Sequence, residues 1–152
     1  MKPKSPELDR LDWRIIETLQ QDGRITSTEL GKRIGLSQPA VTTRIRRLED
    51  LGVIEGYSAR VNHALLGRPI RALIRLRTSH AQIGRCLETF EQTGEIIEAD
   101  RVTGEDCFVL RVVVAQMERL EQIIDSLAAL GAVTTSIILA SYPRKVLAEV
   151  RE

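Results

Sequence analysis

The residues best suited to chemistry lie between positions 37 and 47, where threonines and arginines are interspersed with apolar residues. At about 100° per residue, a helix here places Val41, Ile45 and Leu48 on one face. The outward positions are Pro39, Thr42, Thr43, Arg46 and Arg47. Arginine can form two hydrogen bonds with guanine or hold a phosphate, and threonine can contact base edges or thymine methyl groups. The spacing therefore predicts a surface that reads double-stranded DNA.

Three further side chains extend this surface. Ser37 is suited to cap the helix, and Gln38 can reach adenine, because the N-terminal end of a recognition helix enters the major groove. Arg44 lies nearer the apolar edge of the helix and suits a phosphate contact. The simpler alternative is a solvated charged face, in which the arginines pair with Glu49 and Asp50.

This helix is the last of three that we expect in the first half of the chain. Apolar residues recur at helical spacing from Leu8 to Leu19, and Gly23 ends that segment. Thr26 with Glu29 fits a capping box that opens a second helix, and Gly35 can take the left-handed position that ends it. Two short helices joined by a glycine-containing turn are typical of a helix-turn-helix.

The second half changes to strand alternation. Strands are expected over residues 70–78, 96–102, 107–115 and 133–141, with helices around 83–90 and 120–127. The order β-α-β-β-α-β predicts a ferredoxin-like domain with an antiparallel sheet. A possible short strand, Glu55 to Val61, and a linker join the halves. The predicted fold class is α+β, with a (winged) helix-turn-helix domain over residues 1–62 and a ferredoxin-like domain over 63–152.

The predicted strands carry apolar residues on both faces. Phe108 and Leu110 share one face, while Val109 and Val113 share the other. Such runs indicate a sheet that is covered on both sides. Two helices cover only one side, so we expect a second copy of the chain to cover the other, in a symmetric homodimer.

The bulk composition is that of an ordinary globular protein. Hydrophobic residues make up 43% and charged residues 28%, and the net charge of +1 provides no general attraction to nucleic acid. No apolar run reaches the roughly 18 residues of a membrane span, and residues 1–6 lack the apolar stretch of a secretory signal, so we expect a cytoplasmic, nucleoid-associated protein.

The cysteines and histidines do not form a metal-binding pattern. Cys86 and Cys107 sit in apolar surroundings and favour buried free thiols over a disulfide or a catalytic role. His63 and His80 are isolated, whereas a closed zinc site needs four ligands. We therefore expect neither metal nor cofactor.

Several segments together resemble the leucine-responsive (Lrp/AsnC) family of prokaryotic transcription regulators. The segment from Leu36 to Tyr57 resembles the family's helix-turn-helix, and Leu8 to Ile16 and Asp22 to Arg24 look like its opening helix. Val102 to Leu110 and Val133 to Leu139 resemble its regulatory domain. The resemblance implies a DNA-binding regulator whose dimers pair sheet to sheet and often assemble further, into octamers or similar rings. It also implies an effector related to an amino acid.

The resemblance places this effector near the hairpin Thr103, Gly104, Glu105 and Asp106. The two carboxylates there can hold an ammonium group, and a neighbouring subunit can add hydroxyls from Thr134, Thr135 and Ser136. The simpler alternative is an ordinary tight turn, for which the glycine supplies backbone freedom. Many relatives have an aromatic residue and then an aspartate where this chain has Asp106 and Cys107, so the ligand preference of relatives does not transfer. Trp13 is a second departure, since it falls on the outward side of the first helix and suits an interface.

Two other functions compete with this hypothesis. One is a nucleoid-organising protein without an effector, which would bind DNA broadly. The other is a tetrapyrrole-processing decarboxylase of similar fold, which would need a titratable group placed for acid–base chemistry. No nucleophile–base pair is visible in the sequence, and we therefore expect no enzymatic activity. Neither the effector, the operator nor the direction of regulation follows from the residues.

Overall fold

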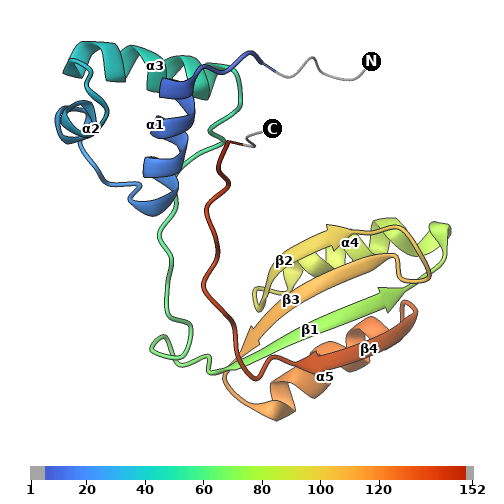
Figure 1. Cartoon of the computed structure of the whole chain (residues 1–152). Coiled ribbons are helices and arrows are strands. Elements are labelled where there is room, and N and C mark those ends of the chain that lie inside the picture. The colour runs from blue at the N-terminus through green and yellow to red at the C-terminus, as the bar shows by residue number, and fades with distance from the viewer. Residues whose placement is uncertain (1–5, 150–152) are drawn as a thin grey trace. The chain divides into compact units, whose positions relative to one another are not determined.

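The computed structural model describes residues 6–149 and divides into two compact units (Figure 1). The first unit combines the chain up to Arg60 with the segment from Pro143 onward, and the second spans Val61–Tyr142. Residues 1–5, on which the expectation about a secretory signal mainly rests, lie outside the described residues. None of the described helices has the length and apolar character needed to span a membrane.

The first unit contains the three expected helices, α1 (Arg10–Gln21), α2 (Ser27–Ile34) and α3 (Gln38–Asp50). Their apolar stripes meet in one core, whose fully enclosed side chains are Ile15, Leu30, Ile34, Val41 and Leu48. Asp9 caps α1 by accepting hydrogen bonds from the N–H groups of Leu11 and Asp12, at 2.9 and 2.8 Å. The Asp12 carboxylate in turn accepts a hydrogen bond from the N–H of Asp9, which completes a capping box.

The turn between α2 and α3 follows the sequence prediction closely. Gly35 has φ 78°, and the N–H groups of Gly35 and Leu36 both donate to the carbonyl of Gly31, at 2.8 and 2.9 Å. The Ser37 hydroxyl accepts from the N–H of Ala40 and opens α3. A side chain on Gly31 would overlap the carbonyl oxygen of Leu36, so the close contact at this turn requires glycine there.

One cap differs from the prediction. The Thr26 hydroxyl accepts from the N–H of Glu29 at 3.1 Å and opens α2 as expected. The Glu29 carboxylate, however, bonds Arg33 one turn further along at 2.7 Å. The reciprocal half of the predicted capping box is therefore replaced by an i,i+4 ion pair.

The second unit has the predicted β-α-β-β-α-β order. Its elements are β1 (Ile70–Arg77), α4 (Ile83–Gln92), β2 (Ile96–Arg101), β3 (Phe108–Val114), α5 (Met117–Ala128) and β4 (Ala132–Ile137), with a short 3-10 turn at His80–Gln82. The sheet order is β2-β3-β1-β4, and all three neighbouring pairs are antiparallel. The fold is thus α+β and ferredoxin-like, as predicted.

Both helices of this unit pack on one face of the sheet. Phe90 of α4 and Leu120 of α5 share a core with Leu110 and Val112 of β3. The rings of Phe90 and Phe108 meet edge to face, with centroids 5.1 Å apart. This face is closed by the unit's own helices.

The other face of the sheet, here called the open face, mixes apolar and charged residues. On β3 it holds Val109, Arg111 and Val113, which pair across the sheet with Arg75, Leu73 and Arg71 in turn. Val113 is buried, whereas Val109 and Arg111 are half-buried. The sequence predicted apolar residues on this face, and the structure adds a row of arginines that the strand pattern did not reveal.

Two predicted strands differ from those observed. The segment from Glu55 to Val61 forms no strand, since its backbone pairs with no other segment among residues 6–149. The last strand ends at Ile137 instead of residue 141, and only the N–H of Ile138 continues the ladder, to the carbonyl of Arg71.

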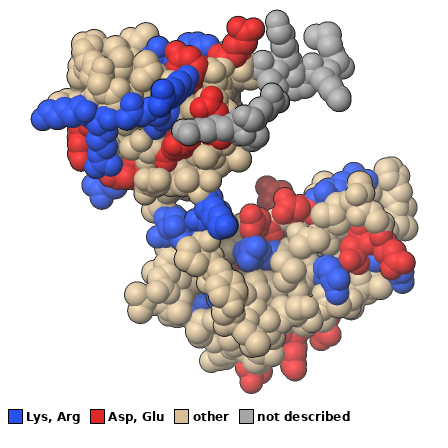
Figure 2. Space-filling view, viewed as in Figure 1, with Lys and Arg blue, Asp and Glu red and all other residues tan. Residues whose placement is uncertain are grey.

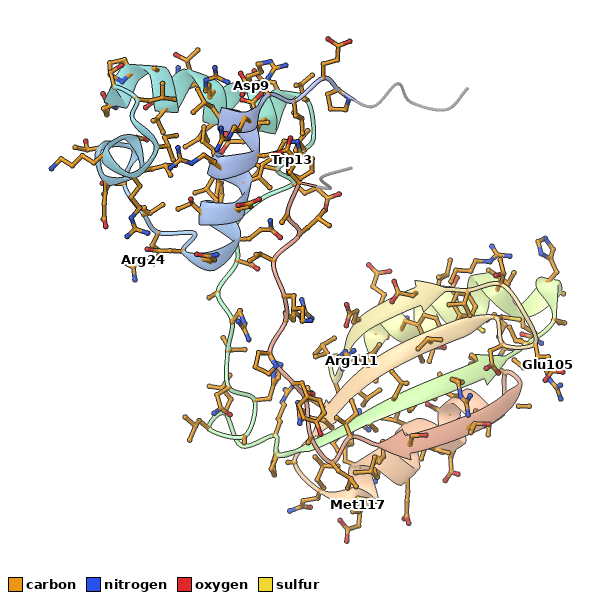
Figure 3. All side chains as sticks on the ribbon, in the orientation of Figure 1. Asp9, Trp13, Arg24, Glu105, Arg111 and Met117 are labelled. Carbon is orange, nitrogen blue, oxygen red and sulfur yellow. The ribbon has the colours of Figure 1, made fainter. Side chains whose placement is uncertain are left out.

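The C-terminal segment returns to the first unit, although the sequence assigned it to the second domain. The Gln20 side chain donates to the carbonyl of Leu147 at 2.8 Å and accepts from its N–H at 2.9 Å. Leu147 also borders an apolar cavity of about 400 Å³, which is lined by Trp13, Leu19 and Tyr57. Trp13 is therefore half-buried beside the C-terminal segment (Figure 3).

Candidate nucleic-acid interface and sensor hairpin

The eight residues predicted to contact DNA all lie on α3 or at its cap. Most are exposed, while Thr42 and Arg44 are half-buried. Pro39 occupies the first turn, where its missing N–H leaves no bond unmade. Figure 2 shows basic side chains on the visible face of this unit, with acidic ones among them. Basic and acidic side chains are thus mixed on this face, which agrees with the small net charge of +1 for the whole chain.

At the start of α3, two side chains hold each other. The Gln38 side-chain amide donates to the Thr42 hydroxyl at 3.0 Å, and this hydroxyl donates to the backbone carbonyl of Gln38 at 3.0 Å. These bonds restrict the Gln38 side chain while leaving it exposed at the helix N-terminus. A polar group held in this way loses less conformational entropy when it binds a partner.

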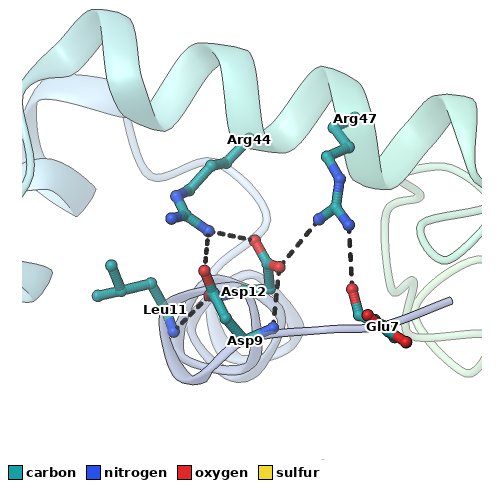
Figure 4. Close-up of polar contacts among 6 residues, drawn as sticks. All are labelled: Glu7, Asp9, Leu11, Asp12, Arg44 and Arg47. Carbon is teal, nitrogen blue, oxygen red and sulfur yellow. Dashed lines mark hydrogen bonds and ion pairs between the residues drawn. The ribbon is translucent and has the colours of Figure 1, made fainter.

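Two of the three arginines of α3 pair with residues of α1 and its cap rather than with Glu49 and Asp50, the partners named in the simpler alternative. Arg44 donates to Asp9 and to Asp12, at 2.7 Å in both cases, and Arg47 donates to Asp12 at 3.0 Å (Figure 4). A second N–H of Arg47 donates to the backbone carbonyl of Glu7 at 3.0 Å. Two of the three arginines are thus tied to α1 and the residues that precede it.

This network changes the titration of its members. Hydrogen bonds from the backbone of Asp12 and from Arg44 lower the pKa of the Asp9 carboxyl. The same carboxylate, together with Asp12, raises the pKa of Arg44. Both shifts favour the charged forms of Asp9 and Arg44.

Arg46 and Thr43 differ from the two tied arginines. Both are exposed, and within residues 6–149 neither side chain has an ion pair or a side-chain hydrogen bond. The expected partners of the arginines are not used either, since Glu49 accepts a bond from the Tyr57 hydroxyl at 2.9 Å. An open groove of about 880 Å³ lies beside Thr43. It is lined by Pro39, Thr43 and Arg44 together with residues at the start of α1.

Sequence reasoning missed the role of Asp9 and Asp12. Their spacing of three residues matches the spacing of Arg44 and Arg47, so each pair lies on one side of its helix. This correspondence was available in the sequence. It becomes an interaction only through the packing of α1 against α3.

The hairpin Thr103, Gly104, Glu105 and Asp106, where the effector is expected and which is here called the sensor hairpin, joins β2 to β3. Thr103, Gly104 and Glu105 are exposed at its tip, and Gly104 has φ 113°, in the region that favours glycine. Figure 3 shows Glu105 at this end of the unit, at the tip of the hairpin. Asp106 is half-buried and lies 3.9 Å from Arg75, measured between Oδ2 and Nε. Arg75 was not among the predicted site residues.

The three hydroxyl residues of β4 are divided between two faces. Thr134 pairs with Arg75 and Ser136 with Leu73, so both belong to the open face. Thr135 pairs with Ile74 on the helix side, where its Oγ1 is buried and has no hydrogen-bond partner. The structure therefore groups Thr134 with Arg75 and Asp106, and separates Thr135 from them.

Neither cysteine forms a disulfide. Cys86 is buried, which raises the pKa of its thiol, while the half-buried Cys107 donates to the carbonyl of Thr78 at 3.1 Å. In the described part of the chain no group of three His, Cys, Asp or Glu residues could hold a metal ion.

Comparison with known proteins identifies both domains. Residues 8–55 match the family model of a winged helix-turn-helix that binds DNA, and residues 71–146 match the Lrp/AsnC ligand-binding domain. The chain is 37% identical over 134 residues to the uncharacterized HTH-type transcriptional regulator YezC of Bacillus subtilis, covering 88% of this chain and 95% of that protein. It is 36% identical over 138 residues to the regulator LrpA of Mycobacterium tuberculosis, covering 89% and 92%.

Solved structures agree with these relatives. LrpC of Bacillus subtilis superposes with a TM-score of 0.86 at 30% identity, covering 92% of this chain and all of that one. The regulator NMB0573 of Neisseria meningitidis, solved with L-methionine, superposes with a TM-score of 0.85 at 24% identity, which shows a shared fold; the alignment covers 93% of this chain and 96% of that one.

A DNA-binding helix-turn-helix followed by an Lrp/AsnC ligand-binding domain, in a chain whose relatives are transcription regulators, defines a class of DNA-binding transcription regulators. Within that class, this chain belongs to the Lrp/AsnC family.

Proposed function

We propose that this regulator inserts α3 into the major groove and reads bases with the exposed side chains at the N-terminal end and middle of the helix. The candidate interface comprises Ser37, Gln38, Pro39, Thr42, Thr43, Arg44, Arg46 and Arg47. The observation that carries the proposal is the exposure of Thr43 and Arg46 on a helix that a Schellman-type turn and a serine cap hold rigidly. Within this set, Gln38, Thr43 and Arg46 are assigned to base edges, whereas Arg44 and Arg47 border the interface with guanidinium groups that are already paired with Asp9 and Asp12.

Binding measurements on the upstream region of its own gene test this assignment. Thr43→Ala or Arg46→Ala is expected to weaken specific binding by about 1–3 kcal/mol while affecting mixed-sequence DNA less. Arg85→Ala, on α4 of the second unit, serves as a control for the loss of one exposed arginine. Unchanged specific affinity in a double Thr43→Ala, Arg46→Ala variant would rule out this helix face.

We further propose that the open face pairs with the open face of a second copy, and that such dimers assemble further, to octamers or similar rings. Support comes from the apolar residues Leu73, Val109 and Val113 on a face that the unit's own helices leave uncovered. The same face carries arginines on β1 and the carboxylates Glu98 and Asp100 on β2, which suits a symmetric contact with itself.

Sedimentation of the full chain tests the dimer. Val109→Asp is expected to shift the protein to monomers, because it replaces an apolar residue of the proposed interface by a charged one. Asp125→Asn, on an exposed position of α5, is the matched control. A monomeric wild-type protein at micromolar concentration would contradict the proposal.

We also propose the hairpin Thr103, Gly104, Glu105 and Asp106 as the effector site, to which a neighbouring subunit adds hydroxyls from Thr134 and Ser136. Asp106 can hold an ammonium group and the adjacent Arg75 a carboxylate, which suits a free amino acid. The L-methionine bound to the structurally similar regulator of Neisseria meningitidis supports this ligand class.

Titration with single amino acids, L-methionine among them, tests this site while light scattering follows the assembly. Asp106→Asn is expected to abolish the response and to leave the affinity for DNA intact. A response of equal size in the variant would place the effector elsewhere. An absence of any response, combined with equal affinity for specific and bulk DNA, would instead favour a nucleoid-organising role.

A further inference from the structure

Among the described residues, Asp12 is the one charged residue that is buried, with 1% of its surface exposed. Each of its carboxylate oxygens has a guanidinium partner, Oδ1 with Arg44 at 2.7 Å and Oδ2 with Arg47 at 3.0 Å. Oδ2 also accepts from the N–H of Asp9 at 3.1 Å. The carboxylate therefore connects the start of α1 to two successive turns of α3 (Figure 4).

These bonds determine what the two arginines can offer to DNA. An N–H group that donates to a carboxylate is not available to a phosphate oxygen, and the carboxylate cancels much of the cation's charge at that distance. Arg44 has 28% of its side chain exposed, whereas Arg46 is exposed and lacks such a carboxylate within the described residues. Positions 44 and 47 therefore carry charge that α1 has already neutralised.

The same bonds also orient the helix. Two arginines, three residues apart on α3, donate hydrogen bonds to the single buried carboxylate of Asp12 on α1. These two bonds oppose rotation or tilting of α3. A rotation of α3 would move Thr43 and Arg46 away from the bases that they are proposed to read. Contacts to bases depend on this placement, whereas contacts to phosphates tolerate more movement.

We propose that Asp12 is a positioning residue that sets the specificity of DNA binding, by fixing the angle of α3 and by withholding Arg44 and Arg47 from the phosphate backbone. Asp9 also forms an ion pair with Arg44 and is the exposed carboxylate of the same network. The inference rests on the proposed insertion of α3 into DNA. It predicts that removing the carboxylate of Asp12 or Asp9 lowers the ratio of specific to non-specific DNA affinity, rather than the affinity for all DNA.

The test compares wild type with Asp12→Asn by measuring binding to its own upstream region and to a mixed-sequence duplex over a range of salt. The slope of log K against log salt counts neutralised phosphates, so each released arginine is expected to make it steeper by about one unit per protomer. Affinity for the mixed-sequence duplex rises at low salt, while the ratio of specific to non-specific affinity falls. A purely structural role would weaken both DNAs and leave the slope as it was.

Two variants separate this effect from others. Asp50→Asn removes the same charge from the end of α3, where the described residues give it no arginine partner, and it is expected to leave the slope near the wild-type value. Arg47→Gln added to Asp12→Asn is expected to return the slope toward wild type. A steeper slope in Asp50→Asn equal to that in Asp12→Asn would overturn the proposal, because net charge alone would then explain it.

Asp9→Asn covers the case in which Asp12→Asn loses its helical circular dichroism. Asparagine still caps α1, so this variant removes the charge facing Arg44 while keeping the fold. It is expected to steepen the slope, but by less than one unit per protomer, because Asp12 still accepts a hydrogen bond from Arg44. An unchanged slope, alongside weakened binding by Thr43→Ala, would reject the role of the carboxylates and retain α3 as the reading helix. If Thr43→Ala also had no effect, the proposed function itself would fail.

Discussion

Between α1 and α3 of the first unit a buried aspartate joins two arginines, whereas the ion pairs described in the second unit lie at the surface. The interiors differ in the same way. Among the described residues, the core of the first unit has five buried hydrophobic side chains, and that of the second has thirteen. A small helical unit removes little apolar surface from water, so directional bonds are needed to select one helix arrangement. A sheet with two helices obtains its arrangement from strand pairing and a larger core.

The largest effect that would separate the two units comes from Asp12. Asp12→Ala removes the buried acceptor of Arg44, Arg47 and the Asp9 N–H and is expected to destabilise the first unit by about 1.5–3 kcal/mol, the range for hydrogen bonds to charged groups. Glu95→Ala breaks the surface pair with Arg119 in the second unit and is expected to cost about 0–1 kcal/mol. Urea unfolding followed by the fluorescence of Trp13, the single tryptophan, reports the first unit, and circular dichroism reports both. Equal losses in the two variants would remove the contrast.

Two glycines are expected to respond with opposite signs. Gly31→Ala places a methyl group against the carbonyl oxygen of Leu36 and is expected to destabilise the first unit by about 1–3 kcal/mol. Gly84→Ala, on α4, meets open space and is expected to stabilise the second unit by up to about 1 kcal/mol, because alanine favours helix. Thermal unfolding of both variants measures the difference. Stabilisation by Gly31→Ala would show that the turn is looser than its hydrogen bonds indicate.

Removing the chain from Pro143 onward tests the contribution of the C-terminal segment to the first unit. The two bonds between Gln20 and Leu147 are exposed, so their loss is expected to cost about 1 kcal/mol. Trp13 emission should shift to longer wavelength as its cover is removed. Gln20→Ala should reproduce part of both effects, and an unchanged emission spectrum in both variants would argue that the segment does not cover Trp13.

The smallest expected effect is the response to acid. The pKa of Asp9 is lowered chiefly by the backbone N–H of Asp12, and that of Glu95 chiefly by Arg119. A carboxyl with a lowered pKa stabilises the fold above its unfolded value, about 4 for these groups, and this contribution is lost as pH falls through the folded value. Asp9→Asn should reduce the loss of unfolding free energy of the first unit as the pH falls. Glu95→Gln should do the same for the second unit. An identical loss in wild type and Asp9→Asn would contradict the shift.

Much of the site was predictable because its signals are local. Ser37, Gly35 and Thr26 act through bonds to residues within a few positions along the chain, so their types and spacing already indicate helix ends. The outward positions of Thr43 and Arg46 follow in the same way from the inward stripe of Val41 and Leu48.

The partners of Arg44 could not be read locally, because Asp9 lies 35 positions away and Asp12 lies 32. The nearby Glu49 and Asp50 were the obvious partners in the sequence. Arg44 instead pairs with α1, because the packed core brings the start of α1 under α3.

The periodicity of the apolar residues and the capping residues thus determined, from the sequence alone, the order of the elements, both domain folds and the surface of α3 that faces solvent. The tertiary structure decided which charges are neutralised, as with Arg47, and which side of β4 each hydroxyl occupies. It also decided that the segment around Leu147 belongs with α1. The physical reason is that hydrogen bonds within a helix or turn join near neighbours in the chain, whereas ion pairs and strand register join residues that only packing brings together.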